Sequence, residues 1–220
     1  MTGPQLAAAA LAGVPAGVQA QGVWAGRRQL FVRFAGEAET ATMYTSAALV
    51  RELERQLSRS KFHSIAIGGR DPLANENFLI AALEAAHPAL PVMLDTDGQR
   101  PGTLKNVARF LALTQVTVDS WIPDASLAHV IETIGEAARA SCAHALVLCP
   151  REDTSDGQLL RVVEQAHGAS KDTQVVIHPP SPSGDQAMLD RRWAALLDQA
   201  MAVHLDTRLV LRLPPPAGLR

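Results

Sequence analysis

The alternation of predicted strands and helices along the chain is clearest in Ser64–Thr96, SIAIGGRDPLANENFLIAALEAAHPALPVMLDT. Two short apolar runs, Ser64–Gly68 and Pro91–Thr96, flank Asn75–His87, whose length and composition indicate a helix. Both runs are apolar throughout rather than alternating, which is typical of parallel strands buried on both faces. The stretch therefore predicts a strand–helix–strand unit of a parallel sheet.

The same alternation continues on both sides of this unit. Further strands are predicted at Gln29–Phe34, Gln115–Asp119, Ala145–Cys149, Gln174–His178 and Arg208–Leu213. Further helices are predicted at Thr45–Arg59, Gly102–Leu113, Asp124–Ala140, Ser155–Ala166 and Gln186–His204. Such repetition requires right-handed crossovers and a parallel sheet, either open or closed as a barrel. We see no long linker, so residues 1–220 are predicted to form one α/β domain, with 1–18 disordered or irregular.

Composition excludes several classes of protein. The 220 residues are 47% hydrophobic and 19% charged, with a net charge of −2, so a nucleic-acid partner is not expected. No apolar run approaches the roughly 20 residues that cross a bilayer, so no membrane partner is expected. Leu6–Ala20 has the small residues of a signal peptide but no preceding Lys or Arg, and we expect a cytoplasmic protein. Cys142 and Cys149 are predicted to be buried thiols, and no metal site is predicted.

Polar residues gather where the predicted strands end, which is where α/β proteins place their chemistry. This rim comprises Gly36, Glu37, Gly69, Arg70, Asp71, Asp95, Thr96, Asp97, Asp119, Cys149, Arg151 and His178. Carboxylates at strand ends also cap helices or pair with Arg, so position alone does not make each of them a site residue. A lone His such as His178 has the same two interpretations, as an acid–base group or as a structural one.

Four segments carry a resemblance to a known family. They are QAQGVWAGRRQLFVRFAG (Gln19–Gly36), IGGRDPLAN (Ile67–Asn75), PVMLDTDGQRP (Pro91–Pro101) and TRLVLRLPPPAGLR (Thr207–Arg220). In this order and spacing they resemble the 7-carboxy-7-deazaguanine synthase branch of the radical S-adenosylmethionine (SAM) superfamily. The resemblance implies a partial (β/α)6 TIM-like barrel of the radical SAM type, with parallel strands.

The resemblance also implies two sites. Its SAM site, vestigial here, would comprise Gly68, Gly69, Asp71, Thr96 and Asp119. Its substrate-like pocket would comprise Gln19, Gln21, Arg33, Arg70, Asp95 and His178. Arg70 is inserted in the glycine-rich motif, where a cation would oppose the amino group of SAM, so any SAM binding is expected to be weak.

One departure from the family bears directly on function. In the family, the glycine equivalent to Gly36 is followed by the first of three cysteines that hold a [4Fe–4S] cluster. Here that position is Glu37, a degenerate cluster position, and no cysteine occurs through Thr45. Iron–sulfur clusters require thiolate ligands, which carboxylates do not replace. We therefore expect no cluster, no resident cofactor and no radical chemistry.

The sequence leaves three functions open. The first is a non-catalytic pseudoenzyme, a structural or regulatory subunit that forms a homodimer or a heterodimer with an active radical SAM homologue. The second is a protein or enzyme that reuses the barrel mouth for a small molecule such as SAM, a purine-like compound or a nucleotide. The third, a radical enzyme with unusual cluster ligation, is opposed by the ligand chemistry.

Overall fold

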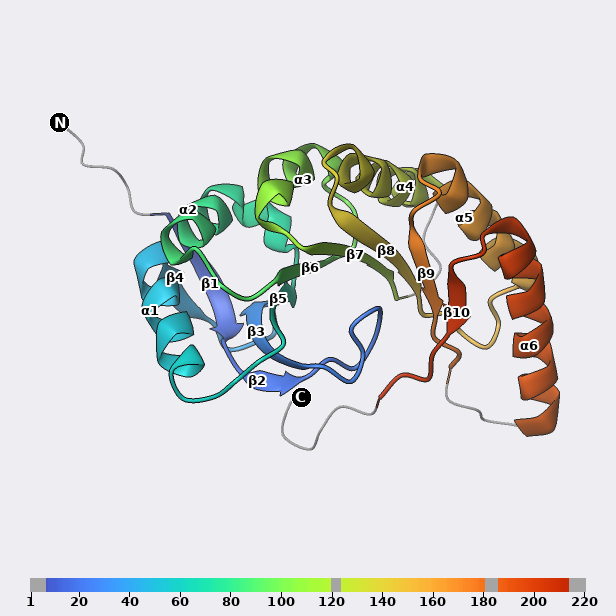
Figure 1. Cartoon of the computed structure of the whole chain (residues 1–220), viewed down its shortest axis with the longest axis horizontal. Coiled ribbons are helices and arrows are strands. Elements are labelled where there is room, and N and C mark those ends of the chain that lie inside the picture. Colours follow the sequence, from blue (N-terminus) through green and yellow to red (C-terminus); the bar gives the residue numbers. More distant parts are fainter. Residues whose placement is uncertain (1–6, 120–123, 181–185, 214–220) are drawn as a thin grey trace.

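A computed structural model describes residues 7–119, 124–180 and 186–213, with the side chains of 124 and 186–190 left undescribed. Its centre is a parallel run of strands that follow one another in space in the same order as in the chain (Figure 1). This run is β3 (Arg28–Phe34), β5 (Ser64–Gly69), β6 (Val92–Thr96), β7 (Leu113–Val118), β8 (Ala143–Leu148), β9 (Gln174–Ile177) and β10 (Thr207–Leu209). The predicted α/β class with a mostly parallel sheet is confirmed.

Three further strands extend the sheet beyond β3. They are β1 (Ala8–Gly13), β2 (Ala16–Val18) and β4 (Thr42–Thr45). Strand β1 pairs antiparallel with both β3 and β4, and β2 pairs antiparallel with β3. The irregular segment predicted over residues 1–18 is thus wrong for 8–13 and 16–18. Leu11 and Ala9 are buried there, because β1 lies between two strands and packs on the core.

The helices cover the convex side of the curved sheet (Figure 1). They are α1 (Ser46–Leu57), α2 (Glu76–Ala86), α3 (Pro101–Val107), α4 (Asp124–Arg139), α5 (Asp156–Ala169) and α6 (Gln186–Val203), with short 3₁₀ turns at Pro72–Asn75 and Ala108–Phe110. The Thr45 hydroxyl accepts a hydrogen bond from the Ala48 N–H at 3.2 Å, which caps the N-terminus of α1. None of the helices in the described ranges is both long and apolar enough to cross a bilayer.

The sheet is not closed, since β4 and β10 are its two ends. The partial (β/α)6 barrel predicted from the resemblance is therefore not confirmed as a barrel. Two apolar clusters fill the convex side, one under α1–α3 and one under α4–α6. A smaller cluster on the concave side comprises Ala66, Met93, Leu113 and Ala145, against which Val23 and Trp24 pack.

Val23 and Trp24 belong to a segment that we call the strap, Gln19–Gly26, which connects β2 to β3 along the concave side (Figure 1). Its ends are tied together, because the Gly26 N–H donates to the Gln19 carbonyl at 2.9 Å. The strap thus forms a compact loop that covers part of the sheet's inner face.

Candidate functional site

A polar cavity of about 520 Å³ lies at the carboxyl edge of the sheet. Its lining comprises Gln21, Gly69, Asp95, Thr96, Asp97, Gln99, Thr117, Val118, Asp119 and Ser126. Strand ends of β5, β6 and β7 supply most of these residues, with Gln21 from the strap and Ser126 from α4. Among the lining residues, three carry carboxylates and none is Lys or Arg, so the cavity favours a ligand with positive charge or N–H donors.

Asp95 is the least exposed of the three carboxylates in this cavity's lining. Burial raises the pKa of its carboxyl group, and the negative charge of Asp119 adds to that rise. The Thr117 hydroxyl opposes the rise by donating to Asp95 Oδ1 at 2.6 Å, and the side-chain amides of Gln115 and Gln21 act in the same direction. A cation or N–H donor placed beside Asp95 would relieve its unfavourable environment.

The loop from β6 to α3 holds the cavity's other acidic wall in a fixed shape. The Gly98 N–H donates to Thr96 Oγ1 at 3.2 Å, and the Gln99 N–H donates to Asp97 Oδ1 at 3.1 Å. The buried Thr133 hydroxyl of α4 donates to the Gly98 carbonyl at 2.7 Å. Hydrogen bonds from the backbone and from Thr133 thus position Thr96 and Asp97.

His178 lies behind the strap rather than in the cavity lining. Its Nε2 accepts a hydrogen bond from the Gly22 N–H at 2.8 Å, so its Nδ1 carries the proton and donates to the Val210 carbonyl at 2.6 Å. Burial lowers the pKa of the imidazole, and Arg212 adds to that effect while the Val210 carbonyl and Asp119 oppose it. Both ring nitrogens are therefore occupied by structural bonds.

Several residues of the predicted sites do not reach the cavity lining. Gln19 is 4% exposed, and its backbone closes the strap. Arg33 pairs with Glu39 at 2.7 Å, and Asp71 pairs with Arg100 at 2.7 Å. Arg70 is exposed, because the chain turns at Gly69, whose φ is +98°.

Of the predicted SAM-site residues, some line the cavity and others do not. Gly69, Thr96 and Asp119 line the cavity, and Asp71 does not. Gly68 is not in the lining but lies beside Asp95, since a Cβ at this glycine would be 3.6 Å from the Asp95 Cβ. Gln99, Thr117 and Ser126 are lining residues that the sequence analysis missed. Thr117 was detectable in principle, because it points to the same sheet face as Asp119, two residues away on one strand.

The degenerate cluster position and the two thiols lie in separate places. Glu37 is exposed in a turn that precedes β4. Cys142 and Cys149 are buried at opposite ends of β8. Burial raises the pKa of the Cys149 thiol to about 12, with a further contribution from Asp119. This thiol is therefore protonated at neutral pH.

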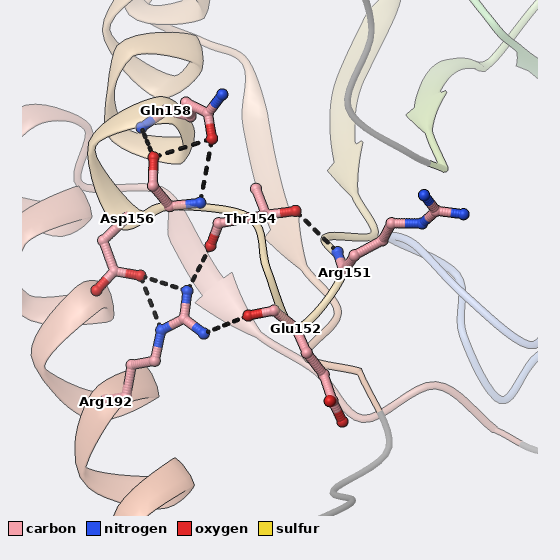
Figure 2. A network of polar contacts seen from close by, with 7 residues as sticks. Arg151, Glu152, Thr154, Asp156, Gln158 and Arg192 are labelled. Atoms are coloured by element: carbon pink, nitrogen blue, oxygen red, sulfur yellow. Dashed lines mark hydrogen bonds and ion pairs between the residues drawn. The ribbon is translucent and has the colours of Figure 1, made fainter.

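Arg192 of α6 fixes the loop that joins β8 to α5 (Figure 2). Its guanidinium donates to Asp156 Oδ1 at 2.9 and 2.8 Å, and to the backbone carbonyls of Glu152 and Thr154. Ser155 caps α5 in a reciprocal pair with Gln158. The Arg151 side chain extends away from this network (Figure 2). The loop at the carboxyl end of β8 thus has a defined backbone beside the rim.

Fold and site together define an α/β protein with an acidic pocket at the carboxyl edge of a mostly parallel sheet. No family model matches the chain. The chain is similar to the 7-carboxy-7-deazaguanine synthase of Methanothermobacter thermautotrophicus, with 29% identity over 116 residues. This match covers 46% of the chain and 45% of the archaeal protein, so it spans less than half the length of that relative. It agrees in part with the resemblance that the four sequence segments indicate.

Proposed function

We propose that this chain is a distant relative of radical SAM enzymes that binds a small, positively charged molecule in its acidic cavity without radical chemistry. The observation that carries the proposal is the half-buried Asp95 carboxyl, which lies in a cavity with two more carboxylates, Asp97 and Asp119, in its lining. SAM, whose sulfonium and amino groups are both cationic, is the first candidate ligand. The open, sequentially ordered sheet is compatible with a partial barrel of the radical SAM type.

The absence of radical chemistry is supported by the donor set. The segment after Gly36 offers carboxylates at Glu37 and Glu39 but no cysteine thiol through Thr45. Glu39 is already occupied by Arg33 and by the Gly36 N–H. The thiols of Cys142 and Cys149 are buried at opposite ends of β8. These residues do not fit a cluster held by three thiolates.

Ligand binding is testable by thermal unfolding of the whole chain with SAM, S-adenosylhomocysteine and AMP. A ligand that binds only the folded state raises the midpoint by mass action. We expect SAM to raise it more than the homocysteine compound, which lacks the sulfonium charge, and AMP to leave it unchanged. Equal shifts with all three, or no shift with any, would contradict a cation-selective cavity.

The variant Asp95→Asn is the matched control, since its amide oxygen still accepts from Thr117 while the charge is gone. We expect it to lose the SAM-induced shift and to gain stability without ligand at neutral pH. The sign follows from the raised pKa of Asp95: as pH rises above the ordinary value of 3.8, the unfolded chain releases this proton before the folded chain does, so the stability of the natural chain falls until the folded-state group also ionises. Urea unfolding near neutral pH and near pH 4 checks this, and a less stable variant at neutral pH would argue against it.

The expected absence of an iron–sulfur cluster is tested separately. Anaerobic reconstitution with iron and sulfide is expected to leave less than about 0.1 iron per chain after desalting. A brown chromophore with nearly four irons per chain would restore the radical enzyme hypothesis, whatever the result with SAM.

Assembly is a second proposal, in which the chain pairs with itself or with an active homologue. It is supported by the outer edge of β4, which has no strand partner among the described residues and carries Met43, 67% exposed. Light scattering after size-exclusion chromatography is expected to give a dimer, and the charged variant Met43→Glu a monomer. A monomer of the natural chain at all concentrations would contradict self-pairing.

A further inference from the structure

The strap, Gln19–Gly26, is attached to the molecule by a few identifiable bonds. The Gly22 N–H donates to His178 Nε2 at 2.8 Å, and the Val23 N–H donates to Gln115 Oε1 at 3.2 Å. The Leu213 N–H donates to the Ala20 carbonyl at 3.0 Å. Since Gln21 lines the cavity, the same bonds hold one of the cavity's walls.

His178 connects three parts of the chain at one ring. It follows β9, accepts from the strap and donates to the Val210 carbonyl beyond β10. The ring is 2% exposed. This arrangement requires one tautomer of the uncharged imidazole, with hydrogen on Nδ1 only, because Gly22 presents an N–H and not an oxygen to Nε2.

Among the described residues, a second proton on this ring has no acceptor. Protonation from solvent would place an N–H at Nε2 opposite the N–H of Gly22, which removes that bond and sets two donors against each other. The Val210 bond survives, since Nδ1–H is present in both forms. The charge would also be buried, and of the two bonds that the described residues make with the ring, the one to the strap is broken.

We propose that His178 acts as a proton-controlled latch. In its uncharged form the ring holds the strap against the sheet through the bond to Gly22. Protonation breaks this bond and frees the strap together with Gln21, which lines the cavity. The device does not depend on the identity of any cavity ligand. It makes access to the cavity a function of pH in the mildly acidic range.

The charged and titratable groups around the ring set its response. Arg212, from the segment after β10, disfavours the proton, and Asp119, at the end of β7, favours it. The Cys149 thiol, at the end of β8, stays neutral because its pKa is raised to about 12. Arg208 of β10 donates from Nη2 to the Val23 carbonyl of the strap. Burial is the largest effect and lowers the pKa of His178, so release begins below the ordinary value of 6.5.

Backbone hydrogen exchange of the full chain tests the latch directly. The protection of the Gly22 and Val23 amides, corrected for the intrinsic pH dependence of exchange, is compared between about pH 7.5 and about pH 5. We expect the natural chain to lose about tenfold or more of this protection at the lower pH. Unchanged protection at about pH 5 would overturn the proposal.

Two variants separate the latch from other titrations. In His178→Gln the amide accepts from Gly22 and donates to Val210 without titrating, so strap protection is expected to be equal at both pH values. His63 is the control, since its ring lies 5.0 Å from that of Trp24 in the strap. His63→Gln is expected to keep the full pH response. A response that survives in His178→Gln, or disappears in His63→Gln, would overturn the proposal.

Discussion

Gly69 ends β5 with a φ of +98°, a conformation that L side chains rarely adopt. A Cβ at this position would lie 2.3 Å from the Phe34 carbonyl oxygen of β3, which is backbone and has no room to move. Gly69→Ala is therefore expected to cost at least about 2 kcal/mol of unfolding free energy. Urea unfolding measures this directly.

Gly157 supplies the matched control for that substitution. It lies in the exposed first turn of α5, and nothing lies within 4 Å of a Cβ built there. Gly157→Ala is expected to be neutral or to stabilise by up to about 1 kcal/mol. If both alanines had the same effect, the argument from positive φ would be wrong.

The sequence predicted the cavity's residues best where a polar side chain directly follows an apolar strand. Asp95, Thr96, Asp97 and Asp119 were identified in this way, because the carboxyl ends of parallel strands meet at one edge. Thr117 was missed, since it lies inside a strand that reads as continuously buried. Arg33 and Arg70 are predicted to line the pocket, but neither does. Arg33 pairs with Glu39, and Arg70 is exposed after the turn at Gly69.

Among the elements, the parallel strands agree with their predicted ranges to within a few residues, except that β10 ends at Leu209 rather than Leu213. Strand β1 was missed because AAALAG has the composition of a helix and contains no β-branched residue. Pairing with β3 and β4 overrides that local preference. These pairings between segments distant in sequence make residues 8–13 a strand, and the local sequence does not encode them.

The loop between β8 and α5 depends on one residue of another element. Arg192→Ala removes hydrogen bonds to Asp156 and to two backbone carbonyls. Because the side chains of Arg192 and Asp156 are 28% and 40% exposed, solvent screening keeps the expected loss to about 1 kcal/mol of unfolding free energy. Hydrogen exchange should show the loss of protection concentrated in residues 151–158.

Arg191 is the neighbouring control, since it is exposed on the same helix. Arg191→Ala is expected to change stability by less than about 0.5 kcal/mol and to leave the 151–158 amides protected. A similar loss in both variants would mean that helix α6, rather than the Arg192 contacts, stabilises the loop.

Considered as a whole, the molecule has a convex core in two parts. One cluster lies under α1–α3 and contains Leu94, and the other lies under α4–α6 and contains Val175. The two are joined by the pairing of β6 with β7 and by the concave cluster, in which Met93 of β6 and Leu113 of β7 meet. Backbone and side-chain contacts thus cross the boundary between the two parts.

This continuity predicts a single cooperative unfolding transition, as expected of one domain. Leu94→Ala and Val175→Ala delete fully buried side-chain atoms in different clusters, at a cost of about 2–5 kcal/mol for the leucine and somewhat less for the valine. Each variant is expected to lower the urea midpoint of the whole transition, measured equally by far-ultraviolet circular dichroism and by tryptophan fluorescence. If each substitution shifted only one of two resolved transitions, the clusters would be separate folding units, and the prediction of one domain would fail.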